Sequence, residues 1–400
     1  MNKRRILLII GLIFIAFNLR APITSVGSLA TLIRDDLGIS NGIAGLITTV
    51  PLIAFAVVSP IIPRISSRIG IGRTMLGGLV LVLMGECIRS YTNALGVYAG
   101  TALMGVGIAT GNVLVPAIIK QRFPSRVGLL TSIYTTAMGI FAGIAAGISV
   151  PLAIDLGWGW RTSLAAWAVL TLLTALVWLP QVAEDAPAGR KQTIQTMPAR
   201  ALFRSPLAWQ VTFFMGLQSL LYYCMVAWLP SIVQSHGLSI AQSGYMALLY
   251  QFISLPASFF VPLLVDKYRD QRKIATASSL LYLCGMLCLL TARTPILITA
   301  AVALCGIGAG SSISLAMCFF GLRTISAEQA SQLSGMAQSI GYVLAAAGPF
   351  LMGALFDYTA SWTIPILIFI CAVLLLTACG LGAGKDQLLS CEPKLAQSAS

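Results

Sequence analysis

Charged residues are scarce in this sequence of 400 residues. They make up 9% of it, whereas about a quarter of a typical soluble domain is charged. Hydrophobic residues make up 58%, and the mean hydropathy is +0.89. So little charge cannot provide the hydrated surface of a soluble fold. The composition excludes an ordinary soluble protein and indicates one that crosses a membrane many times.

Histidine and acidic residues are also few, with a single histidine, His236, and 12 aspartates and glutamates. The sequence has no Ser-His-acid set and no metal-ligand spacing. Its nine cysteines show no disulfide or metal framework, and eight of them lie in or beside apolar runs. We therefore expect no catalytic residue, no metal and no other cofactor. A membrane enzyme would need embedded histidine or acid clusters, and a sensor would need a soluble output domain.

Basic residues outnumber acidic ones, 25 to 12, which gives a net charge of +13. They are spread singly through short loops between apolar runs, a pattern that topology and anionic lipid explain better than a nucleic-acid partner does. Twelve apolar segments are long enough to cross a bilayer at about 20 residues each. They lie near 6–33, 42–63, 74–91, 95–119, 128–154, 160–179, 207–234, 241–265, 274–292, 295–319, 330–356 and 362–381.

The loops predict an orientation. If the N-terminus is inside, 20 of the 25 basic residues fall in cytoplasmic segments. These are Lys3, Arg4, Arg5, Arg64, Arg68, Arg73, Lys120, Arg122, Arg126, Arg190, Lys191, Arg200, Arg204, Lys267, Arg269, Arg272, Lys273, Arg323, Lys385 and Lys394. Only Arg34, Arg89, Arg161 and Arg293 belong to the outer loops and adjoining helix ends. The positive-inside rule then places both termini in the cytoplasm of a multi-pass protein of the bacterial inner membrane.

The two halves of the chain repeat each other. A displacement of 199 residues pairs Ser59 with Ser258 and Pro63 with Pro262, and a displacement of 201 pairs Arg122 with Arg323. We expect an all-α protein of twelve transmembrane helices in two six-helix halves, the major facilitator plan. The predicted parts are a first half at 1–180, a cytoplasmic linker at 181–206, a second half at 207–382 and a cytoplasmic tail at 383–400.

Five stretches carry a resemblance to a known family. They read "NLRAPITSVGSL", "GIATGNVLVPAIIKQRFP", "SPLAWQVT", "YYCMVAWLPSIVQSHG" and "LSGMAQSIGYVLAAAGPFLMG". Over essentially the whole chain, the sequence resembles the cyanate and 2-nitroimidazole transporter family of the major facilitator superfamily, and the later stretches are closer to the nitroimidazole-type members. The resemblance implies a transporter and leaves the solute open.

The superfamily signature between helices two and three, G-x-x-x-D-R-x-G-R, is incomplete here. Ser67 stands where the family has an acid, while Arg68 and Arg73 are kept. The equivalent loop of the second half keeps its acid, Asp266. By resemblance, such an acid closes a cytoplasmic latch by pairing with a basic residue across the bundle. We expect Asp266 to serve as the latch alone, and Arg68 and Arg73 are equally explained as basic residues that set topology.

Arg20 lies in the middle of the first apolar segment, about 21 Å from Ile6 at 1.5 Å per residue. A charge at that depth costs about 2.5–3.5 kcal/mol on insertion scales, and arginine does not lose its proton. A guanidinium facing a water-filled cavity would match two oxygens of a small anion or nitro group, with Thr24 on the same helix face. The alternative is a tether to backbone carbonyls or to Asn112.

Other polar side chains on cavity-prone helices are candidate ligands of a flat, conjugated solute. They are Asn112, Tyr134, Gln218, Tyr222, Tyr223, Gln338 and Tyr342. Each is also explained as a residue that binds helices together, and Asn18, on the opposite face from Arg20, is expected to be such a packing residue. Glu86 and Arg89 are three residues apart near the outer end of helix three and are expected to pair, with gating as the alternative.

The sequence as a whole predicts a secondary active transporter of a small anionic or nitro-bearing solute, working by alternating access, and not an enzyme. A broad-specificity drug exporter of the same superfamily is the main alternative. Glu86 is the only acid at appreciable depth, so protons are coupled either through it or indirectly, through the substrate or exchange. The expected partners are the lipid bilayer, the solute and protons, and the expected state is a monomer.

Overall fold

The structure, a computed structural model, describes residues 3–39, 41–182 and 198–389. The described residues are almost entirely helical, and no strand occurs among them. The helices of the first half are α1 (Lys3–Leu37), α2 (Asn41–Val58), α3 (Ile62–Ile69), α4 (Ile71–Tyr91), α5 (Ala94–Arg122), α6 (Val127–Ile154) and α7 (Gly159–Val182), with a short 3₁₀ turn, η1 (Pro124–Arg126), before α6. The second half contains α9 (Pro206–Ser235), α10 (Ile240–Val265), α11 (Arg272–Thr291), α12 (Pro295–Leu322), α13 (Ala327–Thr359) and α14 (Thr363–Ala383).

Twelve spans were expected, and each expected span coincides with a single helix or, in one case, with a pair of helices. Eleven of the described helices are long and apolar enough to span a bilayer individually, and the twelfth span is a bent pair in which α2 and α3 meet at 57°. The bend follows Pro60, after which α3 runs as a short amphipathic helix with exposed Arg64 and Arg68. The short helix α8 (Ala199–Arg204) lies between the halves in sequence, and most of the predicted linker falls outside the described residues.

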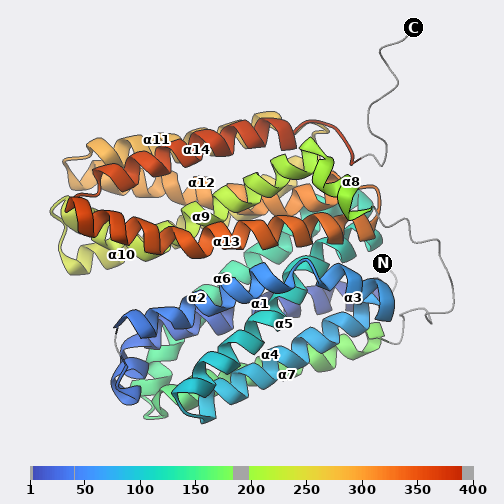
Figure 1. Ribbon diagram of the computed structural model, residues 1–400, viewed down its shortest axis with the longest axis horizontal. Helices are drawn as coiled ribbons and strands as arrows, with labels where there is room; N and C mark the ends of the chain where they lie inside the picture. Colours follow the sequence, from blue (N-terminus) through green and yellow to red (C-terminus); the bar gives the residue numbers. More distant parts are fainter. Residues whose placement is uncertain (1–2, 40, 183–197, 390–400) are drawn as a thin grey trace, which may run out of the picture.

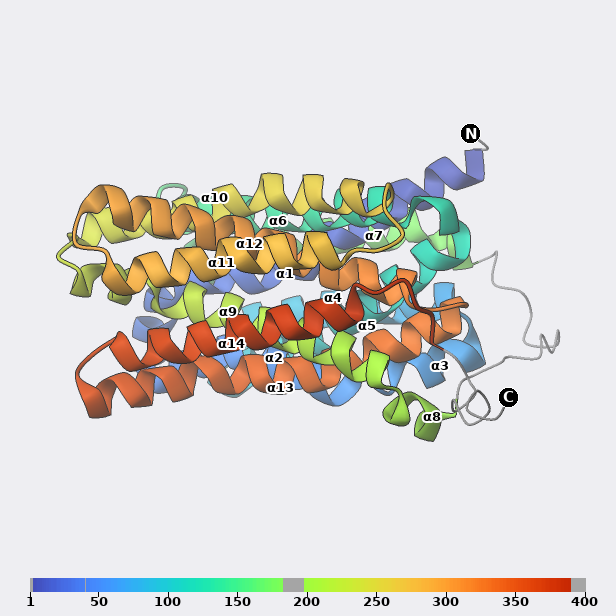
Figure 2. The same ribbon diagram turned by 90° about the horizontal axis from the view of Figure 1, so that it is seen from above.

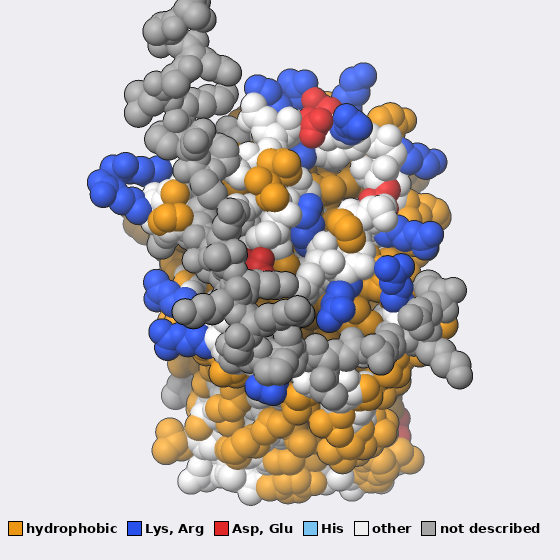
Figure 3. Space-filling model, turned by 90° about the vertical axis from the view of Figure 1, so that its right-hand side faces the viewer, with side chains coloured by type: hydrophobic (Ala, Val, Ile, Leu, Met, Phe, Trp, Pro, Cys, Tyr) orange, Lys and Arg blue, Asp and Glu red, His pale blue; other side chains and the backbone are white. Residues whose placement is uncertain are grey.

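The two halves form two layers of roughly parallel helices (Figures 1 and 2). Within the first half, α4 packs on α5 and α7, and α1 packs on α6; within the second, α9 packs on α13 and α12 on both α10 and α11. The end of the bundle where α1 begins and α14 ends is called here the terminus end. Figure 3 shows this end directly, with many Lys and Arg side chains and few acidic ones.

The halves are joined between mid-depth and the terminus end. Ser132 of α6 donates a hydrogen bond to the carbonyl of Phe259 in α10 at 2.5 Å, and Ser339 of α13 donates to the carbonyl of Ala56 in α2 at 2.5 Å. Close backbone approach makes these seams tight. At Gly335, an added Cβ would lie 2.7 Å from the carbonyl oxygen of Ser59, so glycine is required there. The halves are therefore closed against each other on this side.

A buried arginine closes the terminus end of the second half. Arg323, 2% exposed, donates from Nε to the carbonyl of Ala383 at 2.6 Å and from an Nη to that of Gly384 at 3.0 Å. It also donates to the side-chain oxygen of Gln271. Burial lowers the pKa of Arg323 to about 10, so it still carries its charge at neutral pH. The clamp fixes the end of α14 against the start of α11.

Candidate functional site

Arg20 lies halfway along α1, between the two halves. It donates a hydrogen bond from Nη1 to the hydroxyl of Tyr222 in α9 at 3.0 Å, and its guanidinium carbon lies 4.7 Å from the centre of the Tyr222 ring. Its side chain is partly exposed. Among the described residues it forms no ion pair, and its recorded partner is neither a backbone carbonyl nor Asn112. A cation-π contact compensates part of the charge, but most of the guanidinium donors remain available.

Tyr222 extends the contact into a third helix. Its hydroxyl is within 3.3 Å of the side-chain oxygen and 3.2 Å of the side-chain nitrogen of Gln251 in α10. Gln251 did not figure among the sequence candidates, although it is a polar residue inside an apolar run. Its neighbour Tyr250 packs near Tyr222 and is within 3.3 Å of the Tyr282 hydroxyl. The second half therefore faces Arg20 with a hydrogen-bonded tyrosine network.

Three further predicted tyrosines gather around Arg20. Tyr134 of α6, Tyr223 of α9 and Tyr342 of α13 are all close enough to interact with it electrostatically. Tyr223 meets Tyr222 edge to face, with ring centres 5.4 Å apart, and Tyr342 packs on Phe55 of α2 at 4.9 Å. Each half contributes to this group, which is called here the central site: Arg20, Tyr134, Tyr222, Tyr223 and Tyr342. The structure brings together residues that are over 300 positions apart.

Amide groups close the central site toward the terminus end. Gln338 lies one turn closer to that end than Tyr342 and donates to the backbone carbonyl of Asn112 in α5 at 2.9 Å and to Ser334 at 2.7 Å. The Tyr134 hydroxyl is 3.5 Å from the Asn112 side-chain oxygen. The side-chain oxygen of Gln338 is buried with no hydrogen-bond partner among the described residues. Asn112 and Gln338 thus join the halves, and the side-chain oxygen of Gln338 remains as an unused hydrogen-bond acceptor.

Two of the predicted ligands, Thr24 and Gln218, use their polar groups in hydrogen bonds to other parts of the protein. The Thr24 hydroxyl lies 3.0 Å from the carbonyl of Ala142 in α6 and 3.2 Å from that of Arg20, so it packs α1 against α6. Gln218 is 2% exposed and donates to Ser219 at 2.7 Å. Asn18, expected to be a packing residue, is indeed buried, with hydrogen bonds at 2.6 and 2.7 Å to Thr174 and Thr171 of α7.

The prediction that Glu86 and Arg89 pair near the outer surface is wrong in its geometry. Both side chains are completely buried inside the first half. Arg89 donates from Nη1 to the carbonyl of Pro22 in α1 at 2.6 Å, and no ion pair within 4.0 Å joins it to Glu86. Both Glu86 carboxylate oxygens, and Nε and Nη2 of Arg89, are without a hydrogen-bond partner among the described residues. The Pro22 carbonyl of α1 thus accepts the hydrogen bond from Arg89 that the prediction assigned to Glu86.

Asp266 joins the halves at the terminus end, as the family resemblance implied, but with a different partner. Its carboxylate accepts hydrogen bonds from the backbone N–H groups of Gly128 at 2.7 Å and Leu129 at 2.9 Å, in the first turn of α6. No basic side chain is needed, because a helix N-terminus offers free N–H donors and a positive dipole end. Gly128 permits the approach, since an added Cβ would lie 2.8 Å from the Asp266 carboxyl carbon.

The first half has no such latch at the equivalent position. Ser67 donates to its own helix, to the carbonyl of Arg64 at 2.9 Å, and Arg68 and Arg73 are exposed. Ser67 lines a small pocket together with Glu328, the acid in the first turn of α13. Glu328 therefore already supplies the negative charge that suits the start of α13, and an acid at position 67 would face it.

Within the described residues, no group of three His, Cys, Asp or Glu side chains could hold a metal ion. What the geometry offers is a partly exposed cation among tyrosines, at mid-depth, where two six-helix halves meet. The halves are tied together on one side of it. Such an arrangement defines the class of two-half membrane transporters that expose a central site to alternate sides.

The chain belongs to the Major Facilitator Superfamily, whose family model matches residues 6–349. It is 47% identical over 98% of its length to the uncharacterized transporter YycB of Bacillus subtilis (strain 168), covering 97% of that protein. It is 40% identical over 96% of its length to the 2-nitroimidazole transporter of Escherichia coli (strain K12), covering 97% of it. To the cyanate transport protein CynX of the same strain it is 26% identical over 87% of its length, covering 89%.

The fold agrees with solved members of the superfamily. The proton:xylose symporter XylE, bound to 6-bromo-6-deoxy-D-glucose, superimposes with a TM-score of 0.74 at 14% identity and covers 96% of each chain. The family prediction, including the closer match to the nitroimidazole type, is confirmed. The chain is a secondary transporter of small solutes with two six-helix halves.

Proposed function

We propose that this transporter carries small, flat anionic or nitro-bearing solutes and binds them at the central site. The observation that carries the proposal is Arg20, which has a tyrosine hydroxyl and ring as its recorded partners and no carboxylate among the described residues. Its planar fork of donors matches a pair of oxygens on one group. The tyrosine rings offer faces to a conjugated solute. The relatives named for 2-nitroimidazole and cyanate transport support this class.

The same contact supplies the alternating movement. Arg20 belongs to the first half and Tyr222 to the second, so a solute held by both bridges the halves at mid-depth. On entering, it accepts hydrogen bonds from the Arg20 donors that have no partner, while the Tyr222 hydroxyl keeps Arg20 linked to Gln251. The Asn112–Gln338 contact beneath it must then open for release toward the terminus end. Asp266 acts there as the latch, and Arg68 and Arg73 belong to the same gate.

Topology follows from charge. We propose that the terminus end is cytoplasmic, because basic side chains gather there (Figure 3) while Arg34, Arg161 and Arg293 lie at the opposite end. The structure is then closed on the cytoplasmic side. The proposed parts remain 1–180, 181–206, 207–382 and 383–400, in the bacterial inner membrane. Transport, and not catalysis, is the proposed activity, and the acting unit is a monomer.

Glu86 is the proposed proton site. Its carboxylate is sealed in the first half beside Arg89, which holds α1 through the carbonyl of Pro22, two residues from Arg20. A proton gained or lost at Glu86 would change the charge that Arg89 faces and so reach the solute-binding helix. In vesicles with an imposed pH gradient, Glu86→Gln should abolish accumulation and leave solute exchange intact. Unchanged accumulation would assign coupling to the substrate instead.

A panel of solutes tests the proposed function. Vesicles containing the protein would be assayed for flux of 2-nitroimidazole, cyanate and 4-hydroxybenzoate against cationic dyes, with Arg20→Gln as the site variant. We expect flux of at least one anion or nitro compound that Arg20→Gln abolishes. Flux of dyes alone would establish the alternative, a broad-specificity exporter. Arg20, which has no ion pair among the described residues, favours an anion over a cationic dye at this site.

A further inference from the structure

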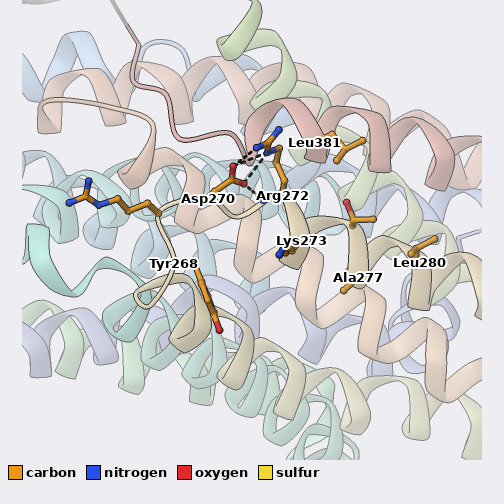
Figure 4. A pocket seen from close by; sticks show the side chains of 9 residues that line it. Tyr268, Asp270, Arg272, Lys273, Ala277, Leu280 and Leu381 are labelled. Carbon is orange, nitrogen blue, oxygen red and sulfur yellow. Dashed lines mark hydrogen bonds and ion pairs between the residues drawn. The ribbon is translucent and has the colours of Figure 1, made fainter.

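A cavity of about 820 Å³ lies outside the transport path, at the terminus end of α11 and beside the end of α14 (Figure 4). It begins at the loop before α11, at Tyr268, Arg269 and Asp270, and continues along α11. Helix α11 is peripheral: it packs on α12 and α14 within its own half, and its outer face bears exposed leucines. The cavity therefore opens where a bilayer would meet the protein.

The part of this cavity nearest the terminus end is positively charged. Arg269, Arg272 and Lys273 line it together with a single acid, Asp270. Asp270 is engaged by Arg272, with 2.6 Å between carboxylate oxygen and guanidinium nitrogen, and these bonds hold the pKa of Asp270 below its usual range. Among the described residues, neither Arg269 nor Lys273 forms an ion pair. Two exposed cations are thus left to face a ligand.

The part of the cavity further from the terminus end is apolar. Ala277 and Leu280 follow Lys273 at four and seven positions, which places all three on one face of α11. Leu280 lies about 10 Å deeper than Lys273, at 1.5 Å per residue. Leu280 is 47% exposed, and Leu381 of α14, on the opposite wall, is 46% exposed. Basic side chains at the membrane boundary with apolar side chains deeper in the bilayer match the charged head group and the acyl chain of one phospholipid molecule.

We propose that this cavity binds an anionic glycerophospholipid of the terminus-side leaflet, its phosphate at Arg269 and Lys273 and an acyl chain along Ala277, Leu280 and Leu381. Basic pockets of this kind between transmembrane helices suit anionic head groups. Tyr268 lies at the head-group level, where amphipathic rings are favoured. The bound lipid braces the joint between the start of α11 and the end of α14, where the N–H of Gln271 meets the carbonyl of Gly384 at 2.8 Å.

Thermal unfolding of the purified full chain in zwitterionic detergent tests the site. Dioleoyl-phosphatidylglycerol should raise the Tm in a saturable manner, and dioleoyl-phosphatidylcholine should not. In the variant Arg269→Gln/Lys273→Gln we expect about 25-fold weaker binding, since each basic residue contributes about fivefold. A matched control, Arg64→Gln/Arg204→Gln, removes two exposed charges from the same end outside the cavity and should respond like the parent protein.

Three results would overturn the proposal. They are an equal response to both lipids, an unchanged response in the Arg269→Gln/Lys273→Gln variant, and an equal rise in Tm with inorganic phosphate or acyl-free glycerophosphoglycerol, which would make the site an anion site alone. Leu280→Gln should weaken the effect of the lipid without affecting any response to phosphate. Because no solute is transported in this measurement, its outcome does not depend on the proposed function of the central site.

Discussion

The two halves of the bundle share one helical plan but place their charges at opposite depths. In the first half, Arg20, Glu86 and Arg89 lie inside the spans. The spans of the second half contain no charged residue away from the helix ends, and tyrosines and amides take the corresponding depth, among them Tyr222 and Gln251. In the proposed function, one half therefore supplies the charge that holds the solute, and the other supplies neutral hydrogen-bonding groups around it.

At the terminus end the distribution is reversed. Here the second half has the specific contacts, the Asp266 latch and the Arg323 clamp, whereas the first half has Ser67 in place of the acid. Ser67 and Asp266 are 199 positions apart, the same displacement that relates the two halves. Because the duplicated parts differ in this way, neither half contains all the residues of the proposed site and gate.

The largest effect is expected at Arg20. Arg20→Gln removes two charge-assisted hydrogen bonds to the solute, worth about 1.5–3 kcal/mol each, so transport should fall by at least about a hundredfold. Removing a charge from mid-membrane should leave Tm unchanged or raised. Arg20→Lys keeps the charge but not the fork and should restore little. Uptake compared at equal membrane abundance measures transport, and thermal unfolding measures Tm. If Arg20→Gln is destabilised and Arg20→Lys restores stability, Arg20 is a tether between helices.

Arg89 should behave in the opposite way. Arg89→Met removes the hydrogen bond to the Pro22 carbonyl and leaves the buried Glu86 carboxylate without a compensating charge inside the first half. An uncompensated buried charge costs about 3–5 kcal/mol of folding stability. The double variant Glu86→Gln/Arg89→Met removes both charges and should recover most of the loss. Thermal unfolding of the single and double variants measures this difference. An Arg89→Met protein as stable as its parent would show that Glu86 does not depend on Arg89.

The contact of Asp266 with α6 gives a smaller effect, at the terminus end of the seam between the halves. Asp266→Asn weakens two bonds to the N-terminus of α6, a capping loss of about 1 kcal/mol. The gate should open more often, which labelling of a cysteine placed at Ser132 would report as faster modification. Ser67→Asp is the matching test in the first half and should not tighten the gate, because Glu328 shares its pocket. Unchanged labelling in Asp266→Asn would remove Asp266 from the gate, and slower labelling in Ser67→Asp would show that Glu328 does not prevent a latch in the first half.

Much of this architecture could be predicted from the sequence, for a physical reason. Lipid forces apolar runs of about 20 residues into helices, so composition alone specified the spans to within a few residues. The depth of Arg20 follows from counting along one helix. Tyr134, Tyr222 and Tyr342 were predicted only as polar residues on cavity-prone helices, and the structure brings them together around Arg20.

The errors concern contacts between helices. The sequence shows that Glu86 and Arg89 share a face of α4, but not that the Pro22 carbonyl of α1 competes for the arginine. It likewise cannot show that Thr24 reaches the backbone of α6, or that Asp266 finds N–H groups and not a basic side chain. Gln251 was overlooked because one amide in an apolar run gives no periodic signal. Each of these depends on the rotation of one helix against another.

The smallest effect is expected at Tyr222, where the comparison of the halves is most direct. Tyr222→Phe keeps the ring over the Arg20 guanidinium and removes only the hydroxyl that joins Arg20 to Gln251. A neutral hydrogen bond contributes about 1 kcal/mol, so apparent affinity should fall by about fivefold, with Tm little changed. Concentration dependence of uptake measures this loss. In the Arg20→Gln background the same substitution should have no further effect on binding, because the hydroxyl acts through the arginine. Additive losses would instead show that Tyr222 holds the solute by itself.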